Sequence, residues 1–408
     1  MILSTQNRRP KADANPLTSS DARVASYGWA LLCGHFAVLL FFLDANRLAI
    51  LTKSDEAICW PYFQNCWKFR FETQASVNIL LLIYAAFIVI SCLALNAARN
   101  RLFWVSLAVV NAFLFVILSL DYRLRGNQEY MLLWVNAVFL LWPAKRWAIP
   151  LIIMSFYFWA GMLKLNYEWL SGAVLYHDLY FIPPKFAWVA CTYVVVLEMV
   201  LIWGLLAKRK WVRWLTLGQL MLFHIESVSQ VGWFYPVLMA ALLSWFVLEW
   251  LCYTKEQLPT LAKLWRGNAP RSVYALIMLF ASFQLVPYLY HGDQPLTAQG
   301  RIFSLDMLQS RPVCDVHAVV HNMDQTTDVI NLLMPNLGAR QVCDPLIYFD
   351  RMTNLCRSHV NDPSFVDADF AMHSRRTTDQ KMTIIADEKD FCRHHETYNM
   401  FSNNRWIK

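Results

Sequence analysis

Long apolar segments constrain the fold of this chain more than any other feature. Nine runs of predominantly apolar residues lie between positions 27 and 290 of the 408-residue sequence. A helix that crosses the hydrocarbon core of a bilayer needs about 20 such residues. The composition agrees, because 57% of the residues are hydrophobic and 16% are charged, whereas soluble domains carry about 25% charged residues. We therefore predict a multi-pass membrane protein.

The apolar runs predict an all-α polytopic membrane helix bundle of about nine transmembrane helices. The expected helices span 27–45, 76–98, 102–120, 129–143, 147–163, 186–207, 211–228, 231–252 and 272–290. Residues 1–26 would form a polar cytoplasmic tail, 27–290 the bundle, and 291–408 a small mixed or β-rich extracytoplasmic domain. With the amino terminus inside, the cytoplasmic segments hold twice as many Lys and Arg residues as the outer loops, which follows the positive-inside rule. The expected location is the inner membrane of a bacterium.

Six cysteines lie in segments predicted to be outside, where disulfides persist. We expect Cys59 and Cys66 to close a local loop and the four cysteines of the carboxyl-terminal domain to pair with one another. Four cysteines allow three connectivities, and the sequence leaves the choice open. No short Cys/His cluster has the spacing of a zinc site, so we expect no metal. The net charge of +7 comes from the loops of the bundle, which indicates membrane topology and no nucleic-acid partner.

Several polar residues occur inside or at the ends of the apolar segments. Such residues are costly in lipid and usually face the bundle interior or a cavity. Lys164 ends the fifth expected helix, His224 lies late in the seventh, and Asn127, Gln128 and Glu129 open the fourth. The predicted topology places all of them in the outer third of the bilayer. We therefore expect one polar pocket that opens outward beneath the carboxyl-terminal domain.

These residues also have structural interpretations. The long side chain of Lys164 could extend to the membrane interface, and His224 could hydrogen-bond between helices. Glu198, midway along the sixth expected helix, is predicted nearer the opposite leaflet, apart from the pocket and paired with an Arg or Ser. The chemical interpretation of Lys164 is more specific than the structural one. Desolvation favours a neutral amine, which is a competent general base or nucleophile.

Four blocks of sequence around these residues resemble one family of membrane proteins. They are YFWAGMLKLNYEWLSG (157–172), FHIESVSQVGWFYPVLMA (223–240), LTAQGRIFSLDML (296–308) and, more weakly, CDPLIYFDRM (343–352). Taken in order, they are similar to motifs of the HTTM and vitamin K-dependent γ-carboxylase family. The first block, with its AG-x-x-K-L…W-x-x-G pattern, is the most specific.

The resemblance implies an enzyme that couples oxygenation of a quinol to carboxylation of glutamate side chains. Vitamin K hydroquinone or a related quinol would be the cofactor, CO2 and O2 the co-substrates, and a peptide or small protein the partner, with membrane lipid around the bundle. The catalytic residues that it implies are Lys164 as the initiating base, Gln128 and His224. The cofactor-binding residues that it implies are Asn127, Trp169 and Met307.

One departure from the family pattern leaves the activity open. Gln128 stands where the family has a histidine that helps to stabilise the reacting carbanion. Carboxylation coupled to quinol oxygenation is one expectation. The alternative is a non-carboxylating HTTM membrane protein that acts in the maturation, export or immunity of a small peptide.

Overall fold

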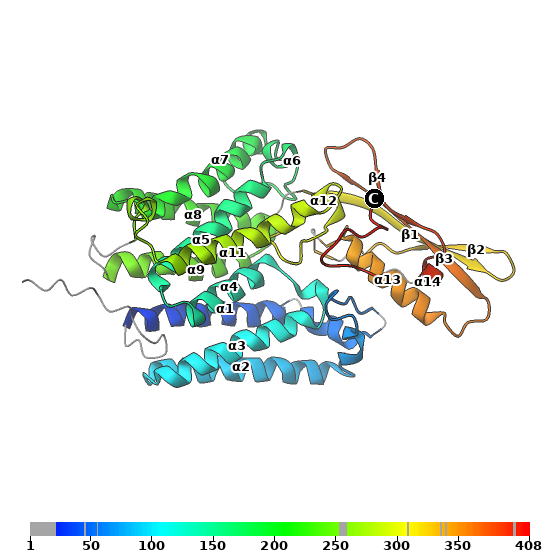
Figure 1. The fold of residues 1–408 in the computed structure, drawn as a ribbon, viewed down its shortest axis with the longest axis horizontal. Coiled ribbons are helices and arrows are strands. Elements are labelled where there is room, and N and C mark those ends of the chain that lie inside the picture. Colours follow the sequence, from blue (N-terminus) through cyan, green and yellow to red (C-terminus); the bar gives the residue numbers. More distant parts are fainter. Residues whose placement is uncertain are drawn as a thin grey trace, which may run out of the picture.

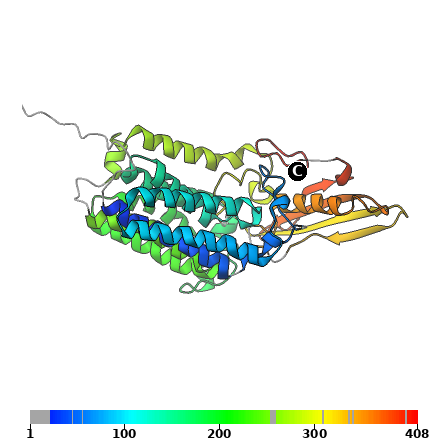
Figure 2. The same ribbon diagram turned by 90° about the horizontal axis from the view of Figure 1, so that it is seen from below.

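The molecule has a helix bundle at one end and a small sheet domain at the other (Figures 1 and 2). The computed structural model describes residues 22–44, 46–54, 56–252, 259–307, 310–334, 337–338, 341–394 and 397–408. Most of the expected cytoplasmic tail, residues 1–21, lies outside the described residues, and the first helix begins at Ala22. The long helices run roughly along the long axis of the molecule, and one end of the bundle carries the sheet domain.

A helix lies at each of the nine expected positions. The nine are α1 (Ala22–Asp44), α2 (Gln74–Asn96), α3 (Asn100–Ser119), α4 (Asn127–Leu141), α5 (Lys145–Leu163), α7 (Ala187–Met199), α8 (Lys210–Val231), α9 (Phe234–Cys252) and α11 (Arg271–Leu285). Three short helices lie between or after them: α6 (Tyr167–Leu170), α10 (Leu261–Trp265) and α12 (Gln294–Thr297). The 3-10 helices η6 (Leu201–Leu206) and η7 (Val286–Leu289) continue α7 and α11.

Six helices among the described residues are long and apolar enough to cross a membrane. They lie at 26–44, 74–96, 100–119, 145–163, 234–251 and 271–289. The prediction of a mostly helical chain with several membrane-spanning helices is confirmed to this extent. The other three of the nine helices, α4, α7 and α8, are too short or too polar to be counted among these six. Helices α4 and α7 have only 15 and 13 residues, and α8 carries polar side chains along much of its length.

The surface of the bundle is apolar where soluble proteins are polar. On α2, Leu82 and Leu93 are 68% and 63% exposed, and α3 presents Val105 and Phe115 in the same way. Contiguous exposed apolar surface of this kind marks contact with a membrane or another protein. By contrast, α5 is enclosed, and its residues from Ala148 to Met154 are all buried. The bundle therefore has a lipid-suited exterior around a central helix.

The carboxyl-terminal domain is a four-stranded antiparallel sheet with strand order β2-β1-β3-β4. The strands are β1 (Pro312–Asn322), β2 (Thr327–Asn331), β3 (Phe365–Arg376) and β4 (Thr383–Glu388), with helices α13 (Pro345–Ser358) and α14 (Phe391–His394). Alternate residues of β1, namely Val316, Ala318 and Val320, are buried, as expected for a strand with one covered face. The prediction of a small mixed domain is confirmed.

Three disulfides join the six cysteines that were predicted to lie outside. Cys59 pairs with Cys66, as predicted from their spacing. In the sheet domain Cys314 pairs with Cys343 and Cys356 with Cys392, which selects one of the three connectivities that the sequence left open. The prediction that these six cysteines form disulfides is therefore confirmed, with all six paired.

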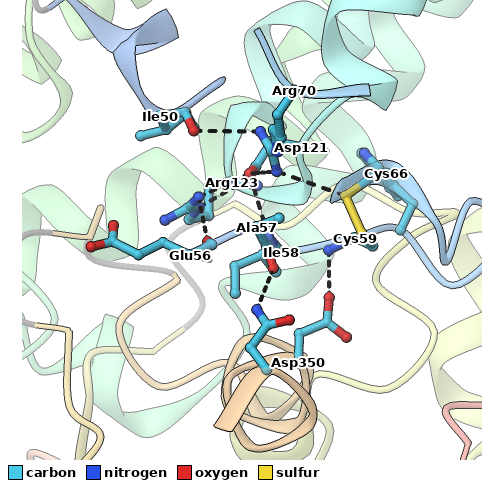
Figure 3. The surroundings of a disulfide bond; sticks show 12 residues. Ile50, Glu56, Ala57, Ile58, Cys59, Cys66, Arg70, Asp121, Arg123 and Asp350 are labelled. Atoms are coloured by element: carbon cyan, nitrogen blue, oxygen red, sulfur yellow. Dashed lines mark hydrogen bonds and ion pairs between the residues drawn. A yellow bond between two sulfur atoms is a disulfide. The ribbon is translucent and has the colours of Figure 1, made fainter. Parts of the chain in front are cut away.

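A buried charge cluster organises the end of the bundle that faces the sheet domain (Figure 3). The carboxylate of Asp121 is fully buried and lies 2.6 Å from an Arg70 guanidinium nitrogen and 2.9 Å from one of Arg123. It also accepts a hydrogen bond from the backbone N–H of Ile58, beside the Cys59–Cys66 disulfide. Asp121 thus ties together the loop after α1 and the loop after α3.

The sheet domain docks on these same loops. Ile58, Trp60 and Tyr122 belong to the hydrophobic core of the sheet domain, although they come from loops of the bundle. Tyr122 donates a 2.8 Å hydrogen bond to Asp344, and the carboxylate of Asp350 on α13 accepts one from the backbone N–H of Cys59. Shared core residues of this kind make the two parts one packed unit.

Asp350 makes this docking sensitive to pH. Burial raises the pKa of its carboxyl from 3.8 to about 7, against the opposing effect of its hydrogen bond with Cys59. Because the folded state binds this proton more tightly than the unfolded state, its stabilising contribution is complete below about pH 4 and is lost as the pH rises through about 7. The loss is on the order of 2–4 kcal/mol.

We expect Asp350→Asn to remove this pH dependence. The asparagine oxygen still accepts from Cys59 but does not ionise. Thermal unfolding in detergent at pH 5 and pH 8 should show a smaller loss of stability between the two values for the variant than for the wild type. Equal losses in both proteins would show that Asp350 does not titrate in this range.

Candidate functional site

A buried ion pair between Lys164 and Glu198 lies at the junction of α5 and α7. Lys164 is the residue that ends α5, and its ammonium nitrogen lies 2.6 Å from both carboxylate oxygens of Glu198. The two residues are 4% and 0% exposed. The ammonium group also lies 5.1 Å from the ring centre of Trp169 and 5.9 Å from that of Phe223. Lys164 is therefore enclosed by a counter-ion and two aromatic rings.

The prediction that Glu198 lies apart from Lys164 is wrong, and the close crossing of α5 and α7 explains why. A Cβ atom at Gly161 would lie 2.6 Å from Met199 and 3.1 Å from Glu198, so only glycine permits this approach. The crossing brings Glu198 to the level of Lys164. The burial of Lys164 also excludes extension of its side chain to the membrane interface.

An apolar cavity of about 280 Å³ lies against this ion pair. Its walls come from α7, α8 and the 173–186 loop, with side chains such as Leu175, Ile182, Val194, Leu197 and Leu222. Four of the residues singled out from the sequence line it: Gln128, Lys164, Trp169 and Met307. The expected pocket is therefore present, but it is mainly apolar rather than polar.

Trp169 is held in place by its own local structure. Asn166 caps α6, and its side-chain oxygen accepts the backbone N–H of Trp169 at 2.9 Å. The indole N–H of Trp169 then donates to the backbone oxygen of Cys191 on α7, also at 2.9 Å. These two bonds fix the ring beside the ammonium group of Lys164.

Asn127 acts on the site indirectly, through the segment 301–307. Four bundle side chains hydrogen-bond to the backbone of this segment: Arg125, Asn127, Tyr130 and Gln284. Asn127 makes two of the bonds, since its amide donates to the oxygen of Asp306 at 2.5 Å and accepts the N–H of Asp306 at 2.8 Å. It thereby fixes the backbone next to Met307, which lines the cavity. Asn127, whose side chain was predicted to contact a cofactor, therefore positions the neighbouring residue Met307.

His224 lies behind the cavity and links two helices. It is fully buried on α8, and its ring nitrogen Nε2 is 2.6 Å from the hydroxyl of Tyr157 on α5. Its ring packs edge-on against that of Tyr235, which does line the cavity. This geometry matches an interhelical hydrogen bond that supports the wall of the site.

A second, polar cavity of about 310 Å³ lies between the bundle and the sheet domain. Its lining includes Arg47, Arg123, Glu129, Gln341 and Asp344. The residues Gln128, Gln230 and Val231 line both cavities, so the two spaces are neighbours. The sequence predicted one pocket at this level, whereas the structure divides it into an apolar space and a polar one that meet at these residues.

Sequence reasoning missed the partner of Lys164, although a signal was present. A buried ammonium group needs a counter-charge, and Glu198 was the acidic residue deepest within the neighbouring apolar run. It also missed the side chains that hold the 173–186 loop. Gln230 accepts the N–H of Tyr176 at 2.9 Å, and Glu226 accepts that of Phe181 at 3.0 Å.

The arrangement places a buried ion pair beside an apolar space, with Lys164 in the lining. Interactions between charges are stronger where water is excluded, and the lining suits a molecule with an apolar body and one polar group. Among the described residues, no group of three or more His, Cys, Asp or Glu side chains is placed to hold a metal ion. Comparisons with protein-family models, with curated proteins and with solved structures find no match for this chain.

Proposed function

We propose that this chain is a membrane enzyme of the vitamin K-dependent γ-carboxylase type, which binds a quinol in the apolar cavity and oxidises it. One observation carries the proposal, namely the buried Lys164–Glu198 pair at the end of that cavity. An ion pair of this kind adds little to stability compared with apolar residues of similar size. Because the pair lies beside a cavity, we assign it a role in the chemistry of a bound ligand.

The chemical character of the cavity lining suits a quinol. Its walls are mainly apolar, and Lys164 and Gln128 supply polar groups in the lining that could bind a ring hydroxyl. A bound quinol would supply the oxidation chemistry that a protein side chain lacks. The chain's own residues would bind it, orient it and exclude water, with Trp169 and Met307 as apolar contacts at the polar end.

In this proposal Lys164 and Glu198 act as a unit. Each Glu198 oxygen is 2.6 Å from Lys164 Nζ, and of the two residues only Lys164 lines the cavity. A proton taken from a ligand hydroxyl would therefore pass through Nζ and come to rest on the Glu198 carboxylate, which leaves Lys164 as the ammonium. The ammonium form of Lys164 would stabilise the resulting oxyanion in a space from which water is excluded. This role differs from that of the isolated neutral amine expected from the sequence.

Gln128 supports a second candidate, quinol oxidation without carboxylation. It occupies the place where the two cavities meet. An amide neither donates nor accepts a proton as readily as the imidazole that the family has there. A peptide in the polar cavity would then be bound without gaining CO2.

We also propose the membrane arrangement that this function needs. All nine long helices, including α4, α7 and α8, would cross the bilayer, with the amino terminus in the cytoplasm and the sheet domain outside. The cysteine pairs support this orientation, because disulfides persist in oxidising compartments. A bacterial inner membrane remains the proposed location.

The experiment that tests the function uses purified protein with vitamin K hydroquinone, CO2, a glutamate-rich peptide and O2, which is the oxidant that supplies the epoxide oxygen. Epoxide formation reports quinol oxidation, and a mass gain of CO2 on the peptide reports carboxylation. We expect Lys164→Ala to lower epoxide formation by about 100-fold or more. Oxidation without a mass gain would favour the second candidate, and oxidation that Lys164→Ala leaves unchanged would contradict both.

A further inference from the structure

The apolar cavity reaches the outside of the bundle between α7 and α8. Tyr193 of α7 and Leu222 of α8 both line the cavity, yet they are 45% and 57% exposed. A side chain that lines a cavity and is also exposed lies at its mouth. The exposed faces of α7 and α8 are apolar, and they include Val189 and Ile225, which do not line the cavity.

Two features define the mouth. Across it, the hydroxyl of Tyr193 donates a hydrogen bond to the side-chain oxygen of Gln219, which joins α7 to α8. On the side of the sheet domain, the 173–186 loop covers the cavity with Leu175, Leu179 and Ile182. This loop is tied to α8 through Glu226 and Gln230. The opening therefore faces sideways from the bundle between α7 and α8, and its edge includes Phe181 of the loop, which also lines the cavity and is exposed.

We infer that the cavity takes its ligand sideways from the bilayer, and that this ligand is an amphiphile whose long apolar tail stays between α7 and α8. Lys164 lines the cavity and is buried with Glu198, whereas Tyr193 and Leu222 are exposed, so a ligand whose hydroxyl head meets Lys164 must enter head first. Along the path from the mouth to this pair the lining is apolar, with Ala190 and Val194 on one side and Leu222 on the other. The part of the tail that lies in this path is kept out of water, and the rest of the tail stays in the lipid.

The inference rests on the proposed function, since it deepens the identity of the quinol. It specifies the route by which the quinol enters and the place of its tail, and it assigns Tyr193 and Gln219 to the gate on that route. A cavity of about 280 Å³ holds a ring and the first part of a tail rather than a whole long-chain molecule. The remainder of the tail would lie in the lipid.

Retention of two naphthoquinone probes by the full chain in lipid nanodiscs tests this route. One probe is an isoprenoid-tailed menaquinone, and the other is menadione, which has no tail. For each probe, binding by the wild type is measured relative to the partition of that probe into empty nanodiscs. On this scale we expect the tailed probe to bind at least about tenfold more tightly than menadione. Ala190→Trp, which fills the path, should reduce retention of the tailed probe by about tenfold or more.

Matched controls separate a blocked route from general damage. Val189→Trp places the same ring on the neighbouring exposed position of α7, outside the cavity lining, and should leave retention within about twofold of the wild type. On α8, Leu222→Trp is a second plugging variant and Ile225→Trp is its control, because Leu222 lines the cavity and Ile225 does not. This pair is used if Ala190→Trp does not fold. Equal binding of the two probes, or equal effects of the plugging and control variants, would overturn the inference.

The outcome is distinguishable from failure of the proposed function. Tail-dependent binding that the plugging variants abolish supports the route even if no epoxide forms. Epoxide formation that is as fast with reduced menadione as with the tailed menaquinol, and unaffected by Ala190→Trp, would support the function and contradict the route.

Discussion

Replacing Glu198 by leucine alone is expected to destabilise the protein by about 3–5 kcal/mol. The change leaves the ammonium group of Lys164, which is 4% exposed, without its counter-ion between two aromatic rings. A charge buried without a partner is far more unfavourable than an apolar side chain in the same place. Thermal unfolding of the detergent-purified variant measures the loss, which should appear as a large decrease in Tm.

The double variant Lys164→Met/Glu198→Leu is the matched control. It replaces the ion pair by two apolar side chains of similar size, and such replacements are neutral or stabilising by about 1–4 kcal/mol. We therefore expect its Tm to return to the wild-type value or to exceed it. If the double variant is as unstable as Glu198→Leu, the ion pair is needed for packing at the α5–α7 crossing, and the two charges would need no functional explanation.

Replacing Asp121 by alanine is expected to have an effect of similar size, about 3–5 kcal/mol, at the end of the bundle that carries the sheet domain. Two guanidinium groups depend on this carboxylate, since the side chains of Arg70 and Arg123 are only 5% and 4% exposed. Both would be left buried without it, and the loop that holds the Cys59–Cys66 disulfide would lose its anchor (Figure 3).

An exposed ion pair in the same loop provides the control for Asp121→Ala. Lys53 and Glu56 are 3.1 Å apart, but their side chains are 54% and 43% exposed. Such pairs contribute about 0–1 kcal/mol, so Glu56→Ala should hardly change the Tm. Protease cleavage of the loop between α1 and α2 gives a second measurement. Faster cleavage in Asp121→Ala but not in Glu56→Ala is expected, and equal rates would show that the cluster does not hold this loop.

The positions of the helices could be predicted because they depend on local sequence. The helix expected at 76–98 is found at Gln74–Asn96, since its apolar run is continuous and bounded by polar residues. The local disulfide Cys59–Cys66 was predictable for the same reason. In each case the information lies within one short segment of the chain.

The pairing of distant groups could not be predicted in the same way. Whether Glu198 meets Lys164 depends on where α5 and α7 cross, and Gly161 sets that crossing through the absence of a side chain. The two disulfides of the sheet domain depend on how the strands and α13 are placed in space. Asn127 was predicted as a contact of the cofactor, yet the path of the 301–307 segment turns its amide to the backbone of Asp306.

The central claim is that the Lys164–Glu198 pair is a reaction centre for a quinol rather than a structural ion pair, and the most direct measurement is quinol oxidation by the Lys164→Met/Glu198→Leu variant. This variant is expected to be folded, so that any loss of activity comes from the loss of the two ionisable groups. The account predicts oxidation of vitamin K hydroquinone at least about 100-fold slower than that of the wild type, at an unchanged or higher Tm. A stable double variant that oxidises the quinol at the wild-type rate would contradict it.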